Sequence, residues 1–167
     1  MPVRKLFSLS LAVFTVGAFA ALVEQDPDWK EVDVPPPPIF SKDKLVPIEM
    51  PSYVSMKFGV DPATLTVTRD GIVRYVMVAT NTSGSVNAMY EGIRCSAGEF
   101  KTYARLSSSG QWATVKEPQW RALDDNNTSR HALGLARQGA CDGRSAAASS
   151  AAEIVWALKN PQRSPNN

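Results

Sequence analysis

The sequence predicts an α+β fold in which two C-terminal helices pack on an antiparallel sheet, a meander of five or six strands. Two observations predict this fold. Between residues 53 and 115, short runs rich in β-branched and aromatic residues alternate with clusters of turn-forming residues. From residue 129 onward, apolar residues recur at the spacing of an amphipathic helix, which needs a surface to pack on.

The predicted strands follow one another with short turns between them. The run over residues 72–80 is apolar on both of its alternating faces, as is typical of a central strand. Asp70-Gly71 before it is a hairpin signal, and Ala97-Gly98 turns a later hairpin. We expect strands over residues 53–60, 65–68, 72–80, 86–96, 99–106 and 112–115.

The last third of the chain predicts the two helices. Ser129 is expected to cap the first helix, which Gly139 ends. Ser145 is expected to begin the second helix, and Asn160-Pro161 to stop it. The apolar stripe of the second helix consists of Ala147, Ala151, Ile154, Val155 and Leu158.

The chain is long enough for one domain, which we expect over residues 53–160, followed by a disordered tail over residues 161–167. Residues 21–52 are predicted to form an acidic and proline-rich arm. Four consecutive prolines at 35–38 favour an extended polyproline II segment without internal hydrogen bonds.

Composition excludes several classes of function. The 18 basic and 16 acidic residues are too evenly balanced for the electrostatic footprint of a nucleic-acid-binding protein. One histidine and two cysteines leave few ligands for a metal. The sequence therefore predicts no nucleic-acid binding, no cofactor and no metal site.

The first 20 residues have the pattern of a secretory signal peptide. Arg4 and Lys5 precede an apolar run over residues 6–17, and a small-x-small triplet follows at residues 18–20. We expect export with cleavage after Ala20, and no stable membrane span afterwards. The alternative is an uncleaved anchor over residues 6–23, which is close to the shortest segment that spans a bilayer.

Cys95 and Cys141 are the only cysteines, and the oxidising compartment implied by export favours a disulfide between them. The alternative of two buried free thiols depends on a reducing compartment, for which the sequence has no signal.

Glu91 is the main candidate for a site residue, because strand alternation places its carboxylate on the apolar face with Met89 and Ile93. A buried carboxylate needs a partner, and Arg130 is the predicted one. The alternative is a catalytic acid. A hydrolase would use Glu91, or the Asp124/Asp125 turn, together with His131, although no nucleophile motif accompanies them.

The hairpin over residues 86–106 is predicted to present an outer face for a protein partner. Its residue types are those enriched at interfaces. The face comprises Tyr90, Arg94, Tyr103 and Arg105, and Trp112 and Trp120 extend it. The equally weighted alternative is that the arm folds back over this face, with its acidic residues meeting the arginines.

Several of these motifs resemble the cryptic neisserial protein-like family over residues 28–160. They are Asp28-Trp29-Lys30-Glu31, Tyr90-Glu91-Gly92-Ile93-Arg94-Cys95, Gly98-Glu99-x-Lys101-x-Tyr103-Ala104, Asn127-x-x-Arg130, Cys141 and Glu153-Ile154-Val155-x-Ala157-Leu158. The resemblance implies a small exported protein of Gram-negative bacteria, and it implies no catalytic residue. It places the protein in the periplasm, or on the inner membrane if the N-terminal segment stays uncleaved.

The function that the sequence favours is a non-catalytic periplasmic binding or accessory protein, which contacts a protein partner in the cell envelope. The alternative is a small envelope hydrolase that uses Glu91 or Asp124/Asp125 with His131.

Overall fold

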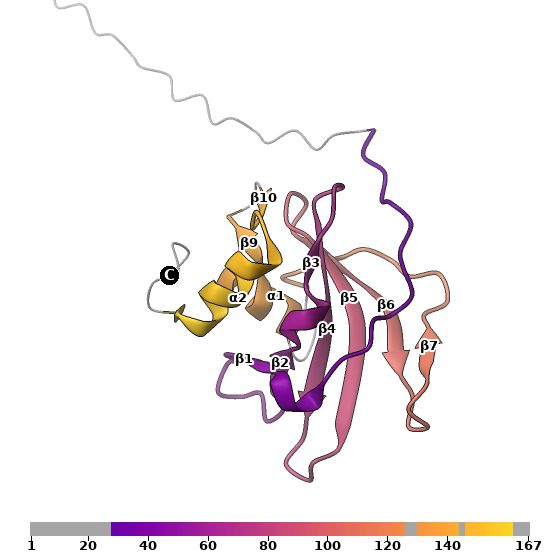
Figure 1. The fold of residues 1–167 in the computed structure, drawn as a ribbon, viewed down its shortest axis with the longest axis vertical. Helices are drawn as coiled ribbons and strands as arrows, with labels where there is room; N and C mark the ends of the chain where they lie inside the picture. Colours follow the sequence, from indigo (N-terminus) through magenta and orange to yellow (C-terminus); the bar gives the residue numbers. More distant parts are fainter. Residues whose placement is uncertain (1–27, 126–129, 144–145, 162–167) are drawn as a thin grey trace, which may run out of the picture.

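The computed structural model describes residues 28–125, 130–143 and 146–161, and its core is one antiparallel sheet (Figure 1). Strands β1, β2, β4, β5, β6 and β7 are neighbours in that order, while β3 pairs with β4 and β8 with β6. The predicted α+β meander is confirmed. The strands are β1 (Val46–Ile48), β2 (Lys57–Val60), β3 (Thr66–Val67), β4 (Ile72–Thr80), β5 (Val86–Arg94), β6 (Glu99–Leu106), β7 (Trp112–Thr114) and β8 (Arg121–Ala122), with the small pair β9 (Cys141–Asp142) and β10 (Ala146–Ala147) apart from this sheet.

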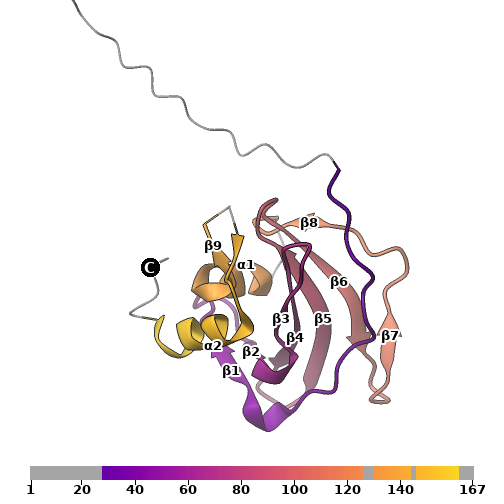
Figure 2. The same cartoon turned by 45° about the horizontal axis from the view of Figure 1, so that its top comes forward.

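The central strand β4 is buried from residue 72 to residue 79, because both faces of the sheet are covered. One face packs against α1 (His131–Leu135), the adjoining η3 (Ala136–Ala140) and α2 (Ala151–Lys159). Segment 28–45, with η1 (Lys42–Lys44), runs along the opposite face and packs Phe40 and Leu45 on it (Figure 2). The short η2 (Pro62–Thr64) connects β2 and β3.

The second helix begins later than predicted. Residues 146–147 pair with β9 as β10, and α2 begins after Ser150. The Ser150 side chain accepts a hydrogen bond from the Glu153 backbone N–H, and the Glu153 carboxylate accepts hydrogen bonds from Ser149. These contacts satisfy the free N–H groups of a helix start, so Ser150 is the cap instead of Ser145. The predicted cap of the first helix, Ser129, lies outside the described residues.

Two strands of the sheet were not predicted. β1 lies within the segment predicted as an arm and contains Pro47, which an edge strand tolerates because proline lacks a backbone N–H. β8 has only two residues, too few for a periodicity to be recognised.

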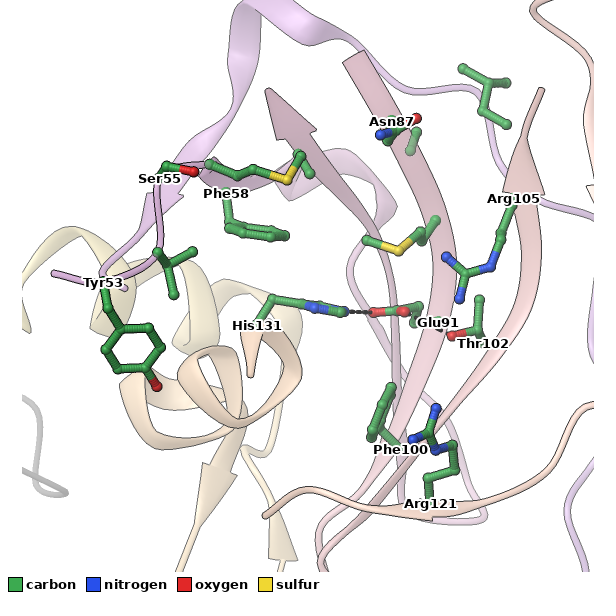
Figure 3. Close-up of a pocket in the computed structure, with 16 residues that line it drawn as sticks. Tyr53, Ser55, Phe58, Asn87, Glu91, Phe100, Thr102, Arg105, Arg121 and His131 are labelled. Carbon is green, nitrogen blue, oxygen red and sulfur yellow. Dashed lines mark hydrogen bonds and ion pairs between the residues drawn. The ribbon is translucent and has the colours of Figure 1, made fainter. Parts of the chain in front are cut away.

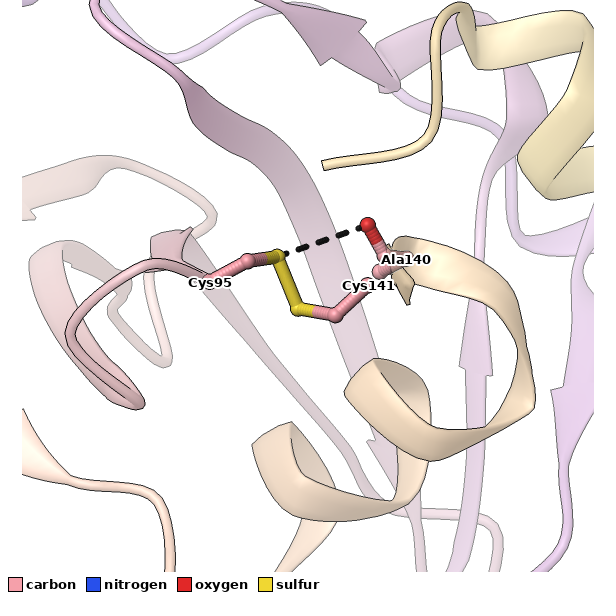
Figure 4. The surroundings of a disulfide bond; sticks show 3 residues. All are labelled: Cys95, Ala140 and Cys141. Atoms are coloured by element: carbon pink, nitrogen blue, oxygen red, sulfur yellow. Dashed lines mark hydrogen bonds between the residues drawn. A yellow bond between two sulfur atoms is a disulfide. The ribbon is translucent and has the colours of Figure 1, made fainter. Parts of the chain in front are cut away.

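The predicted disulfide between Cys95 and Cys141 is present, with the two Cα atoms 5.5 Å apart (Figure 4). Cys95 directly follows β5, and Cys141 begins β9 just after η3. The bond therefore ties the helical layer to the central part of the sheet, and both cysteines are buried.

Candidate functional site

Glu91 lies in the middle of β5 and is completely buried on the helix-covered face. Its carboxylate has hydrogen-bond contacts with three side chains: His131 Nε2 at 2.8 Å, the Thr102 hydroxyl at 2.9 Å and the Tyr75 hydroxyl at 3.2 Å. Burial raises the pKa of the Glu91 carboxyl, but the His131 charge and the three hydrogen bonds outweigh it, so that the pKa lies below its usual value. Glu91 is therefore a stabilised, ionised carboxylate.

The predicted partner Arg130 is wrong by one residue, because the carboxylate pairs with His131. Arg130 precedes α1 with a left-handed backbone, φ 49°. Successive helical side chains point about 100° apart. The sheet is therefore reached by His131 and not by its neighbour. Glu91 does have a buried side-chain partner at the helix start, but the sequence alone did not identify which residue supplies it.

The His131 ring is held between two phenylalanines. It stacks on Phe58 with the ring centroids 5.3 Å apart and the planes 4° from parallel. Phe100 meets it edge-on at 6.1 Å. Since Glu91 engages Nε2 as well, ring packing and the hydrogen bond together fix the orientation of the imidazole.

A pocket of about 640 Å³ opens beside this pair, and Figure 3 shows Glu91 and His131 pointing toward each other within it. Apolar side chains form much of its wall, and polar or charged side chains lie around them. The lining residues are Tyr53, Val54, Ser55, Met56, Phe58, Ala79, Asn87, Ala88, Met89, Glu91, Phe100, Thr102, Arg105, Leu106, Arg121 and His131. The structure thus brings Glu91 and His131 into one concave site.

Arg105 was predicted on the outer face of the hairpin, and the structure corrects this. A β-bulge interrupts the pairing of β5 and β6, where Tyr90 faces Ala104 but Glu91 faces Thr102. Tyr103 is the extra residue, so every residue after it lies on the face opposite to simple alternation. Arg105 consequently faces Met89 across the strands and lines the pocket.

The predicted partner-binding face is covered by segment 28–45. Tyr90 and Tyr103 are buried beneath it, 2% and 5% exposed. Glu31 accepts hydrogen bonds from the Tyr103 hydroxyl at 2.6 Å and from Lys101. The prediction of an open face is therefore wrong for these tyrosines. The covering carboxylate is that of Glu31, and it contacts Lys101 and Tyr103 instead of Arg94 or Arg105.

The other predicted members of that face contact the same segment. The Arg94 guanidinium lies 3.7 Å from the centroid of the Trp29 ring. Trp120 meets Trp29 edge-on at 6.0 Å, and Trp112 meets Phe40 at 6.0 Å. These aromatic contacts are internal to the chain. The aromatic character of segment 28–45 at Trp29 and Phe40 was the available sequence signal for this packing.

Asp124 and Asp125, the other predicted acids, do not join the Glu91–His131 pair. Asp125 accepts a hydrogen bond at 2.8 Å from Arg121, which lines the pocket. Asp124 lines a second pocket of about 620 Å³ next to the disulfide. Within the described ranges, no group of three or more potential metal-ligating side chains is found.

Comparisons with known proteins place the chain in a family. No curated protein and no solved structure matches it. None of the helices in the described part of the chain is both long and apolar enough to cross a membrane. A family model matches residues 24–159, well over half of the sequence, and the chain therefore belongs to the CNP1-like family.

Proposed function

We propose that the protein is a non-catalytic binding protein and that the pocket beside Glu91 and His131 is its binding site. The observation that carries this proposal is the pocket itself, whose volume of about 640 Å³ lies in the range of small-molecule sites. Its lining combines apolar and aromatic side chains with polar and charged groups that could orient a ligand. Contact with a protein through the outer hairpin face is not part of the proposal, because segment 28–45 covers that face.

The location is part of the same proposal. The signal-peptide pattern of residues 1–20 and the disulfide between Cys95 and Cys141 both favour an oxidising compartment outside the cytoplasm. We infer that this compartment is the periplasm, and that the CNP1-like family is the group of cryptic neisserial protein-like proteins which the sequence resembles.

The chemistry of the pair favours binding over catalysis. The low pKa of Glu91 keeps its carboxyl ionised at neutral pH, so it has no proton to donate as a general acid. Three hydrogen bonds also make the carboxylate a weak base. The Nε2 atom of His131, which is the ring nitrogen farther from the backbone, is engaged in the hydrogen bond with Glu91. The pair is better suited to hold the pocket in shape than to transfer protons.

The second candidate is the envelope hydrolase, which the closeness of Glu91 and His131 in one pocket favours. It would use Glu91 to orient the imidazole, as carboxylates do in catalytic triads. Under this hypothesis, the purified protein cleaves model esters or amides, and His131→Gln abolishes cleavage while ligand binding persists. An absence of turnover above the His131→Gln background contradicts it.

Protein-observed NMR with a set of small apolar and amphipathic compounds tests the binding proposal. We expect compounds that bind to shift resonances of Phe58, Met89 and Phe100, which line the pocket. Asn87→Trp places a large ring at an exposed lining position and should abolish these shifts. Gln111→Trp, an equally large change at an exposed position outside the lining, should leave them intact.

Two results contradict the proposal. One is a set of shifts that persists unchanged in Asn87→Trp. The other is the absence of any compound that shifts the pocket resonances, since the pocket would then bind no member of the class of ligand proposed for it.

A further inference from the structure

We propose that the ligand of this pocket is an amphipathic monoanion, whose acidic group binds Arg105 and whose apolar body lies against the aromatic wall. This inference rests on the proposed binding function and names its ligand class. It is carried by the backbone geometry that directs Arg105 into the pocket and by the charges that surround it.

The bulge at Tyr103 is what places Arg105 in the site. Met89 faces Arg105, Tyr90 faces Ala104 and Glu91 faces Thr102, so β6 advances two residues where β5 advances one. Without this extra residue, Arg105 would lie on the face that segment 28–45 covers. Bulges commonly redirect a side chain next to a functional site. Here the redirected side chain is a cation that points toward the pocket interior (Figure 3).

Arg105 has no counter-charge in the part of the chain that the structure describes. It makes no hydrogen bond or ion pair with any of the described residues, and it is solvent-exposed. The neighbouring lining cation, Arg121, is paired with Asp125. The Glu91 carboxylate, which also lines the pocket, has hydrogen-bond contacts with His131, Thr102 and Tyr75. A guanidinium without a partner, presented in a concave site, is suited to bind a carboxylate through two parallel hydrogen bonds.

The ligand charge follows from this arrangement. One acidic group neutralises Arg105, and a second negative charge would approach the buried Glu91 carboxylate without a free cation to meet it. A positively charged head group would be repelled by both lining arginines. We therefore assign the head group one negative charge.

The body of the ligand is assigned from the apolar side chains of the lining. Met56, Phe58, Met89 and Phe100 all line the pocket. Aromatic rings and thioethers accept aliphatic chains and rings of varied shape. An unbranched carboxylate combines both required parts in one small molecule, which makes octanoate a direct probe.

Isothermal titration calorimetry with octanoate, octanol and octylamine tests the assignment on the purified protein at constant salt and neutral pH. We expect octanoate to bind about tenfold or more tightly than octanol, as for a hydrogen bond to a charged group, and octylamine to bind most weakly. Arg105→Gln should remove the preference for octanoate over octanol. Arg105→Lys should retain part of it, because the charge stays while the two-pronged geometry is lost.

Controls separate this inference from the function on which it rests. Arg69→Gln removes an exposed arginine outside the lining and should leave the preference for octanoate over octanol unchanged. The melting temperature of Arg105→Gln should equal that of the wild type. If octanol and octanoate bind equally and Asn87→Trp blocks both, the anion assignment is wrong while the binding function stands. If none of the three compounds binds, both proposals are overturned.

Discussion

His131 Nε2 lies 2.8 Å from Glu91 Oε2, joining the start of α1 to the middle of β5 across 40 residues of sequence. Both side chains are buried, with Glu91 fully inaccessible to solvent. Removing one side chain of a buried hydrogen-bonded pair leaves the other without a partner in a medium of low polarity, which is more costly than breaking a surface contact. The contact therefore contributes to stability as well as to the shape of the pocket.

Glu91→Gln should lower the free energy of unfolding by about 2–3 kcal/mol. The amide keeps the side-chain volume but removes the charge that His131 faces, and its NH₂ group lacks the accepting capacity of a carboxylate oxygen. Urea denaturation followed by circular dichroism measures the change. Glu99→Gln is the matched control, since Glu99 is partly exposed and lies 4.0 Å from Arg94, and it should cost less than about 0.5 kcal/mol. Equal effects of the two substitutions would show that the Glu91–His131 contact adds no stability.

The same carboxylate predicts a pH dependence. The pKa of Glu91 in the folded protein is lowered from an ordinary value of 4.5, despite the opposing effect of burial. A lowered pKa contributes stability above the unfolded-state value, and this stability is lost as the pH falls through the folded-state pKa. The stability difference between the wild type and Glu91→Gln should therefore be largest near neutral pH and shrink below about pH 4.5. Denaturation curves over a pH series measure it, and a difference independent of pH would contradict the ionised state of Glu91.

Glu31→Ala should loosen segment 28–45 from the sheet. The Glu31 carboxylate accepts hydrogen bonds from Tyr103 and Lys101, and its loss leaves the buried Tyr103 hydroxyl without this partner. We expect a loss of about 2 kcal/mol in unfolding free energy. Hydrogen exchange of the Val32 amide, which donates to Asp70, should also become faster.

Asp33→Ala is the control for this substitution, because Asp33 is an exposed acid two residues along the same segment. It should leave both the stability and the Val32 exchange rate near those of the wild type. Should Asp33→Ala loosen the segment as much as Glu31→Ala does, general charge and not the Tyr103 contact would hold the segment in place.

Gly139→Ala should separate η3 from α2. Gly139 has φ 142°, and a Cβ atom at this position would lie 2.5 Å from Ala157 Cβ. Backbone strain and the clash together should cost about 2–4 kcal/mol. Gly143→Ala isolates the backbone contribution, since Gly143 has φ 59° and a Cβ atom there would meet none of the described atoms within 4 Å, and it should cost about 1 kcal/mol. Thermal or urea unfolding of both variants measures this, and equal losses would exclude the contact with Ala157 as the cause.

The features that depend on local order along the chain could be predicted from the sequence. Turn residues such as Asp70-Gly71 and Ala97-Gly98 set the succession of strands, and the apolar run at 72–80 identified the strand that is buried on both faces. Short turns between successive strands then favour pairing between neighbours, which is the meander observed. Cys95 and Cys141 could pair only with each other, so that the disulfide needed no tertiary information once export was inferred.

Which side chains meet depends on the packed fold and could not be predicted from local patterns. A single extra residue at Tyr103 reverses the faces of the rest of β6, and no local pattern marks a bulge, so Arg105 was assigned to the wrong side. The choice of His131 over Arg130 depends on how the start of α1 lies against the sheet, where the His131 ring packs on Phe58 and Phe100. The fold of this chain follows from short-range patterns, whereas its pocket depends on contacts between segments far apart in the sequence, which only the packed structure brings together.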